Sequence, residues 1–200
     1  RHLGQRRVLV AASTREKDGT DEAHEILRAW RQHGCADDLL VLVPRHPERF
    51  RAAAKYAQSL GLTVQKRSSG EAVAPSTQVW VGDSMGEMFA YYALADAVFV
   101  GGSLVDTGCQ NIIEPMSCGK PVLFGPSVHN FQAACTGALA FGAARQIASA
   151  DELVQTVYRW WQNPEEAAAL AQRAVQFVAQ HKGASERMAQ RIEDGVKRKG

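Results

Sequence analysis

The strongest constraint on the fold is the regular alternation of short apolar runs with segments of helical periodicity. Most of the apolar runs end in Gly, Pro or Ser. Continuous apolar strands that alternate with helices are typical of a parallel sheet covered on both faces. The expected strands are 7–12, 39–43, 62–65, 78–81, 97–100, 121–124 and, as an edge strand, 145–148.

The segments between these strands carry the spacing of amphipathic helices. The expected helices are 21–33, 48–60, 86–94, 115–118, 128–139, 151–161, 164–180 and 184–196. The fold class is therefore expected to be α/β, a Rossmann-like parallel sheet with helices on both faces. The sequence shows no repeat or break in composition, so residues 1–200 are expected to form one domain, with 1–6 and 197–200 frayed.

Composition excludes several classes of protein. The net charge of +2 and the pI near 8.4 argue against a dedicated nucleic-acid binder, which carries a strongly basic face. No apolar run approaches the roughly 18 residues that a membrane span needs. The four cysteines and six histidines show no metal-ligand spacing, and no serine lies in a nucleophile elbow. Because the chain does not start with Met, we interpret it as a fragment of a longer protein.

The loops that follow the expected strands collect the polar, Gly-rich and Pro-rich residues. In parallel sheets, ligands bind outside the carboxyl ends of the strands. A ligand cleft is therefore expected at this edge, lined by segments 13–15, 44–47, 82–87, 101–114 and 125–130.

Two of these segments have the chemistry of a phosphate site. Arg45 places a permanently charged, forked donor at a strand end, although a solvated surface arginine is the plain alternative. Gly86 would let a ligand approach backbone N–H groups at a helix start. The alternative there is ordinary capping by Ser84 or Asp83. Neither a Walker loop nor the Rossmann glycine fingerprint is present.

The segment 111–115 combines an amide, a carboxylate and a proline. Pro115 suits the first turn of a helix and places Glu114 at or just before that helix. The Glu114 carboxylate could accept both hydroxyls of a ribose, and Asn111 could offer its amide to a base or a phosphate. The alternative is a variant of the capping box, with Asn111 as N-cap and Glu114 reaching back.

In this order along the chain, the motifs resemble those of the lipid A 3-deoxy-D-manno-octulosonic acid (Kdo) transferases, in their C-terminal half. The segments that carry the resemblance are 11–14, 44–50, 82–87, 101–103, 111–115, 119–122 and 125–126. The resemblance implies one half of a GT-B glycosyltransferase, in which this domain holds the sugar nucleotide CMP-Kdo. The missing N-terminal half would hold the acceptor, the catalytic base and the membrane-associating segment.

The resemblance also implies which residues contact CMP. These are Pro44, Arg45, Met85, Gly86, Glu87, Asn111, Ile112, Ile113 and Glu114. Ser13, Thr14 and Ser103 are further candidates for contact with the donor sugar or its phosphate. No catalytic residue, metal or additional cofactor is expected in this chain. The sequence departs from the family pattern at Ser84, often Thr, at 109–110, often Gly-His or Gly-Gln, and at Arg15, often His.

The expected activity is inverting transfer of Kdo from CMP-Kdo to a lipid A precursor, at the cytoplasmic face of the bacterial inner membrane. The fragment itself is expected to be soluble, to bind CMP and CMP-Kdo without nucleic acid, and to be inactive alone. Acceptor and membrane would be reached only through the missing half. Two alternatives are a non-catalytic nucleotide-binding module and a GT-B enzyme that uses a uracil nucleotide.

Overall fold

A parallel sheet of seven strands runs through the centre of the computed structural model, which describes the backbone of residues 6–197 and the side chains of residues 6–180. The strands are β1 (Val8–Thr14), β4 (Leu39–Pro44), β5 (Val64–Lys66), β6 (Val79–Val81), β7 (Ala97–Val100), β8 (Val122–Phe124) and β9 (Arg145–Gln146). Their order is β5-β6-β4-β1-β7-β8-β9, and every neighbouring pair is parallel. The expected α/β sheet is confirmed.

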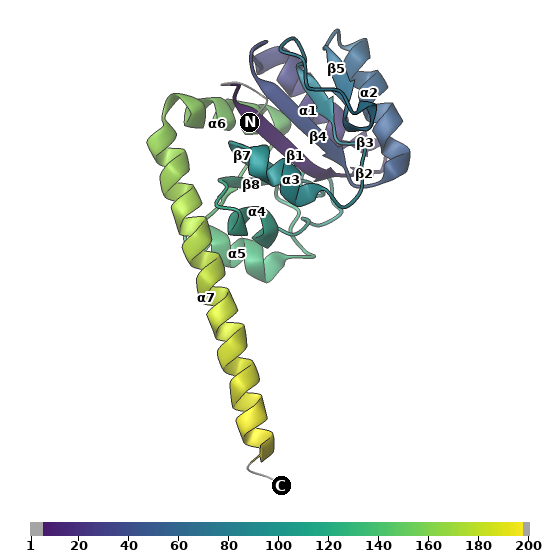
Figure 1. The fold of residues 1–200 in the computed structure, drawn as a ribbon. Helices are drawn as coiled ribbons and strands as arrows, with labels where there is room; N and C mark the ends of the chain where they lie inside the picture. The colour runs from purple at the N-terminus through teal and green to yellow at the C-terminus, as the bar shows by residue number, and fades with distance from the viewer. Residues whose placement is uncertain (1–5, 198–200) are drawn as a thin grey trace.

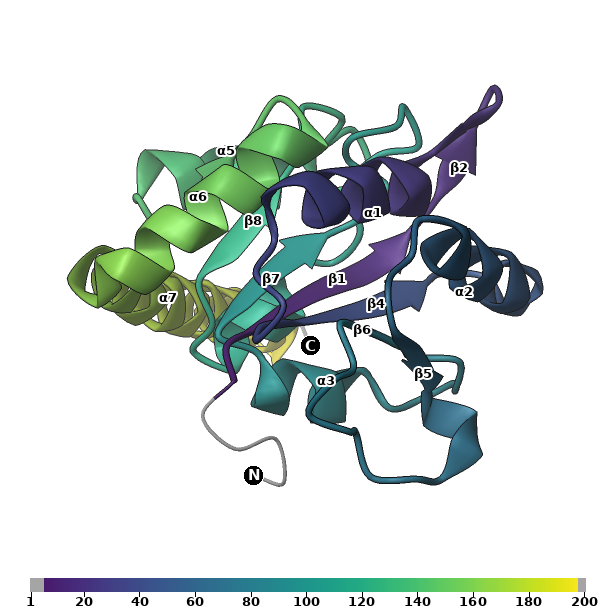
Figure 2. The same ribbon diagram turned by 90° about the horizontal axis from the view of Figure 1, so that it is seen from above.

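Helices cover both faces of this sheet (Figures 1 and 2). The first face packs against α1 (Glu22–His33), α2 (Phe50–Ser59) and α6 (Ala150–Gln162). The second face packs against α3 (Met88–Leu94), α4 (Ile113–Ser117), α5 (Gln132–Ala140) and the first part of α7 (Pro164–Lys197). Along β1, Leu9 and Ala11 belong to the first core, and Val8, Val10 and Ala12 belong to the second. This burial on both sides explains why the strand is apolar at successive positions.

The order of the strands creates a switch point beside β1. From β1 the chain continues to β4, β5 and β6 on one side, and then crosses to β7 on the other side of β1. The connections at the carboxyl ends of β1 and β7 therefore leave in opposite directions. Ligands of doubly wound folds bind at such a point.

A small antiparallel hairpin follows β1, where the sequence was expected to form a polar loop. It consists of β2 (Glu16–Lys17) and β3 (Thr20–Asp21). Asp18 and Gly19 form its turn with φ values of 50° and 81°, as a primed hairpin turn requires. Its strands are tied to other loops by the ion pairs Glu16–Arg49 (2.8 Å) and Lys17–Asp106 (2.9 Å).

The helix boundaries differ from the expected ones where loops lead into helices. α3 begins at Met88 instead of residue 86, and α5 begins at Gln132 instead of residue 128. α4 begins earlier than expected, at Ile113, so that Pro115 lies inside its first turn. Single 3₁₀ turns, η1 (Pro47–Arg49) and η2 (Arg67–Ser69), occupy parts of the expected helix 48–60 and loop 67–76. The loops at the carboxyl edge are therefore longer before α3 and α5 than the sequence predicted.

The ends of the chain also differ from expectation. Arg6 was expected to be frayed, but its guanidinium donates to the carbonyl oxygens of Asp37 (3.0 Å), Ala74 (3.2 Å), Asp38 (2.8 Å) and Thr77. Residues 1–5 and 198–200, the rest of the expected frayed ends apart from Lys197, lie outside the described residues. Arg6 therefore ties the start of β1 to two other connections.

One continuous helix replaces the two helices that were expected at the C-terminus. α7 runs from Pro164 to Lys197 and extends well beyond the rest of the molecule (Figure 1). Gly183 lies between the two expected helices, but an isolated glycine costs a helix only about 1 kcal/mol relative to alanine. Among the described residues, no helix is both long enough and apolar enough to cross a membrane.

Candidate functional site

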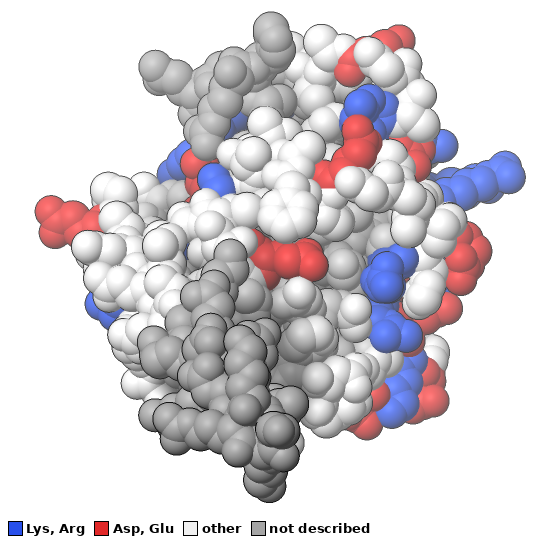
Figure 3. All heavy atoms as spheres, turned by 60° about the horizontal axis from the view of Figure 1, so that its bottom comes forward, with Lys and Arg blue, Asp and Glu red and all other residues white. Residues whose placement is uncertain are grey.

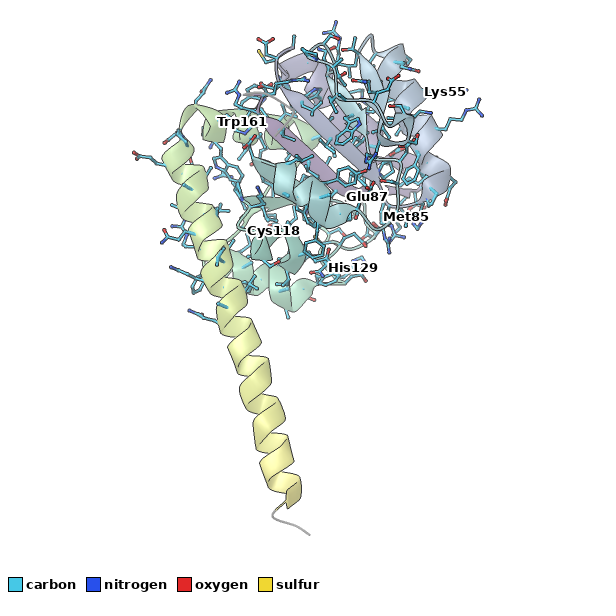
Figure 4. All side chains as sticks on the ribbon, viewed as in Figure 1. Lys55, Met85, Glu87, Cys118, His129 and Trp161 are labelled. Carbon is cyan, nitrogen blue, oxygen red and sulfur yellow. The ribbon has the colours of Figure 1, made fainter. Side chains whose placement is uncertain are left out.

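The predicted ligand loops follow strands that are neighbours in the sheet. β4 lies between β6 and β1, and β1 lies between β4 and β7. Gly82, directly after β6, donates its N–H to the Leu42 carbonyl of β4 at 2.9 Å. The segments 44–47, 82–87 and 101–114 therefore start side by side at one edge. Figure 4 shows Met85, Glu87 and His129 at this side of the molecule.

Arg45 projects from the end of β4 without a partner in the described part of the chain. Its N–H donates to the Thr14 carbonyl at 2.9 Å, which fixes the backbone against β1. Pro44 is buried and Arg45 is exposed. No hydrogen bond or ion pair joins the Arg45 guanidinium to another described side chain. An exposed, unneutralised guanidinium on a fixed backbone is suited to binding an anion.

The turn before α3 is held by side-chain contacts other than the expected capping bonds. Neither Ser84 nor Asp83 caps the helix, because Glu87 occupies the N-cap position and no side chain caps its N–H groups. Ser84 Oγ instead donates to the Glu87 carboxylate and lies 2.8 Å from the Tyr91 hydroxyl. The expectation of simple capping at this turn is wrong, and the local N–H groups are left without side-chain acceptors.

Gly86 keeps this turn open. Its φ of +78° lies in the left-handed region, and an added Cβ would meet no atom within 4 Å. Met85 beside it is 61% exposed. A ligand can therefore approach the backbone at Gly86 without displacing other groups.

Replacing Gly86 by alanine tests whether this open backbone binds ligand. The left-handed conformation costs an alanine about 1 kcal/mol. The methyl group would also stand where a nucleotide approaches, so we expect weaker CMP binding in calorimetry and little loss of thermal stability. Gly61→Ala is the matched control, because Gly61 also has open space and a φ of +76° but follows α2. Equal CMP affinity in both variants would show that Gly86 lies outside the site.

Arg67 contacts the turn that contains Gly86, which the sequence did not indicate. It lies in η2, and its guanidinium is 3.0 Å from Glu87 Oε1. The hydrogen bond from Ser84 and then that from Arg67 hold the pKa of Glu87 below its ordinary value. The adjacent Ser68 donates its N–H and hydroxyl to Asp83 at 2.8 and 2.6 Å. No sequence signal distinguished Arg67 from a loop residue, because its partners come from a different connection.

The side chains of Asn111 and Glu114 bond within their own segment, but not as the capping-box alternative had it, because Ile112 is the N-cap of α4 and no side chain caps that helix. Asn111 Oδ1 accepts from the Ile113 N–H at 2.9 Å, and its amide donates to Glu114 Oε1 at 3.1 Å. Glu114 is half-buried at the start of α4, whereas the whole of Ile112 is buried and has no exposed surface for the predicted contact with CMP. Burial, followed by the charge of Glu114, raises the pKa of Tyr92 in α3. Glu114 therefore lies close to α3 as well as to the carboxyl edge.

Ser13 and Thr14 lie at the end of the central strand. Ser13 adopts a left-handed φ of 56°, at the point where the register between β1 and β4 shifts between Ala12 and Thr14. Thr14 is almost fully buried, and its hydroxyl has no hydrogen-bond partner among the described residues. Their contact with a donor stays a prediction.

Ser103 does not reach the surface of this edge. Its side chain is fully buried. Its hydroxyl donates to the Val100 carbonyl at 2.7 Å and accepts from the Gly125 N–H at 2.8 Å. In this arrangement Ser103 joins the ends of β7 and β8, so the predicted contact of its side chain with a ligand is corrected to a structural role.

Glu22 organises the loops on both sides of the switch point, which the sequence did not indicate. It is fully buried, and its carboxylate accepts N–H groups from Gly102 (2.7 Å), Leu104 (2.8 Å), Ser103 (3.1 Å) and Arg15 (3.1 Å). Burial raises the pKa of Glu22, and the four N–H donors oppose that shift. In the sequence it is one of the ordinary acidic residues at a helix start, so nothing marked its role.

Charges of both signs share this edge, and the two described cavities lie elsewhere. On the face in Figure 3, basic and acidic side chains lie in mixed groups along one side. A cavity of about 370 Å³ lies between α1 and the start of α6, and another of about 330 Å³ lies beside Arg7 and Trp161. The described residues contain no cluster of three or more potential metal ligands.

Comparisons with known proteins agree with this geometry. No protein-family model matches the chain. The 3-deoxy-D-manno-octulosonic acid transferase of Bordetella pertussis is 38% identical over 193 residues, which cover 94% of this chain and 45% of that protein. The enzyme of the same name from Haemophilus influenzae is 41% identical over 130 residues, which cover 63% of this chain and 29% of that protein. The chain thus spans less than half the length of these curated relatives.

Two solved structures are also similar to this chain. The C-terminal CMP-Kdo binding domain of WaaA from Acinetobacter baumannii has a TM-score of 0.83 and 34% identity, covering 88% of this chain and 91% of that one. The glycosyltransferase WaaG matches with a TM-score of 0.57 and 18% identity over 88% of this chain and 43% of that one, which supports the fold alone. The expected half of a GT-B glycosyltransferase is confirmed. The chain belongs to the 3-deoxy-D-manno-octulosonic acid transferase family, in which it matches the C-terminal domain.

Proposed function

We propose that this chain is the donor-binding domain of a Kdo transferase and binds CMP-Kdo at the carboxyl edge of its sheet. The observation that carries the proposal is that Arg45, Gly86 and Glu114 lie in the segments that follow β4, β6 and β7. With β1, these strands take up four consecutive places in the sheet, β6-β4-β1-β7, and their carboxyl ends lie at one edge. The likeness to a domain named for CMP-Kdo binding supports the same ligand.

Each group has a role that follows from its chemistry. Arg45 and the N–H groups near Gly86 bind the phosphate of CMP, while Glu114 accepts the ribose hydroxyls and Asn111 orients Glu114. Pro44, Met85, Glu87 and Ile113 lie in the same segments and complete the CMP contacts, and the buried Ile112 supports its segment from below. During transfer, the bond from the anomeric carbon of Kdo to the phosphate oxygen breaks and CMP leaves with the bonding electrons. Arg45 would stabilise the negative charge that grows on that phosphate.

The remaining part of the reaction needs residues outside this chain. The acceptor hydroxyl of a lipid A precursor attacks the anomeric carbon from the opposite side, with inversion, and loses its proton to a base. We place this base, the acceptor site and the attachment to the cytoplasmic face of the inner membrane in an N-terminal half of the full protein. The finding that the chain covers 45% of one relative and 29% of another supports this division.

Two linked measurements test the proposed function. In calorimetry, we expect the chain to bind CMP at least about tenfold more tightly than UDP, a difference of about 1.4 kcal/mol. We expect no Kdo transfer by the chain alone and measurable transfer after the N-terminal half is added. Tighter binding of UDP would favour a GT-B enzyme that uses a uracil nucleotide. CMP binding without transfer in the reassembled protein would favour a non-catalytic module.

A further inference from the structure

We propose that Arg15 binds the carboxylate of the donor sugar and makes the domain selective for CMP that is linked to a sugar acid. The proposal rests on the proposed function, because it requires CMP-Kdo at the carboxyl edge. It makes Arg15, whose side chain is permanently charged, a residue that determines the specificity for the donor.

The first argument is the charge balance at this edge. Three cations of the edge loops are neutralised by carboxylates, in the pairs Lys17–Asp106, Arg49–Glu16 and Arg67–Glu87. The guanidinium groups of Arg15 and Arg45 form no ion pair or hydrogen bond with other described residues. These two arginines therefore remain available to external anions.

The second argument is their relative position. Arg15 directly follows Thr14, the residue whose carbonyl accepts the N–H of Arg45 at 2.9 Å. The backbones of Arg15 and Arg45 are therefore adjacent, at the ends of β1 and β4. A Cβ added to Gly102 would lie 3.3 Å from Arg15 Cδ, so the Arg15 side chain passes over the turn that follows β7. Arg15 and Arg45 therefore reach two neighbouring parts of the edge.

The third argument is that Arg15 is held in place. The Glu22 carboxylate accepts the N–H groups of both Arg15 (3.1 Å) and Gly102 (2.7 Å). The Glu22 N–H in turn donates to the Arg15 carbonyl at 3.0 Å. One buried carboxylate thus fixes the backbone of Arg15 against the glycine turn beneath its side chain, which reduces the ordering cost of binding.

The ligand supplies two anions at matching positions. In an octulosonic acid joined to CMP, the carboxyl group is attached to the same anomeric carbon as the phosphate oxygen. Two adjacent guanidinium groups suit two anions that are only a few bonds apart. The nucleoside contacts near Glu114 and Gly86 lie on the side of α3 and α4, so a sugar extending past Arg45 reaches Arg15 at the central strand. A nucleotide linked to a neutral sugar would leave Arg15 without this partner.

Calorimetry with the full 200-residue chain tests this assignment. The probes are CMP and freshly prepared CMP-Kdo, and the variants are Arg15→Ala, Arg15→Lys and, as control, Arg159→Ala, an exposed arginine of α6. We expect Arg15→Ala to bind CMP within about twofold of the parent chain but to lose about tenfold in CMP-Kdo affinity. Arg15→Lys should recover part of that loss, and Arg159→Ala should bind both probes normally.

The outcomes separate this proposal from the proposed function. An equal loss of CMP and CMP-Kdo affinity in Arg15→Ala would assign Arg15 to the phosphate and overturn the carboxylate role. Unchanged affinity for both probes would remove Arg15 from the site. If the parent chain bound neither probe, the proposed function itself would fail and this assignment with it.

Discussion

Replacing Arg45 by alanine is expected to weaken CMP binding by about 10- to 100-fold. Hydrogen bonds to charged groups contribute roughly 1.5–3 kcal/mol each, and each 1.4 kcal/mol is tenfold in affinity. The fold should not suffer, because the Arg45 side chain is exposed and its backbone N–H bond to Thr14 remains. Isothermal calorimetry gives the affinity, and thermal denaturation checks the fold.

The neighbouring His46 provides the matched control for this prediction. His46 is also exposed on the same connection after β4. His46→Ala should change CMP affinity by less than about threefold, which is about 0.7 kcal/mol. A dissociation constant for Arg45→Ala equal to that of His46→Ala would exclude Arg45 from the phosphate site. The proposed binding edge would then lack its main cation.

Replacing Glu22 by alanine is expected to destabilise the domain by about 4 kcal/mol or more. The change removes the acceptor of four N–H groups, and an unsatisfied buried donor costs about 1–3 kcal/mol. Water that enters the cavity recovers part of this cost. At about 2–4 °C per kcal/mol for a chain of this size, the melting temperature should fall by roughly 8–16 °C. Thermal and urea denaturation measure the change.

Glu25 is the control for the loss of an acidic residue from the same helix. Its side chain is 43% exposed and pairs with Arg28 on the surface, and such a pair contributes at most about 1 kcal/mol. Glu25→Ala should therefore lower the melting temperature by no more than a few degrees. If Glu22→Ala were as stable as Glu25→Ala, the four N–H bonds could not be what holds the loops after β1 and β7 together.

The sheet and the edge at which the candidate loops meet were predictable because they follow from local patterns. Strands buried on both faces must be apolar at successive positions, as 8–12 and 39–43 are. Parallel pairing then places all the following loops at one edge. Arg45 could be singled out because it follows a strand and carries a permanently charged side chain. Gly86 could be singled out because it lies in the connection after another strand and has the backbone freedom of glycine.

The features that could not be predicted depend on partners far apart in the chain. Glu22 bonds to residues 80–82 positions away, and Arg67 pairs with Glu87, which is 20 positions away. An acidic residue at a helix start and an arginine in a loop have ordinary local explanations, which hide such roles. The prediction for Ser103 was wrong for the opposite reason, because its local pattern suggested a role that the tertiary structure does not support. Its Gly-Gly-Ser segment looks like a ligand loop, but tertiary packing turns the hydroxyl inward to β7 and β8.

The central claim is that CMP binds at the carboxyl edge, between the ends of β4 and β6 and the start of α4. A titration of the isotope-labelled chain with CMP, followed by NMR of the backbone amides, tests it most directly. The account predicts the largest shift changes at Arg45, Gly86 and residues 111–114, with little change near Arg7 and Trp161. Shift changes concentrated at the cavity beside Trp161, or at the one between α1 and α6, would contradict it.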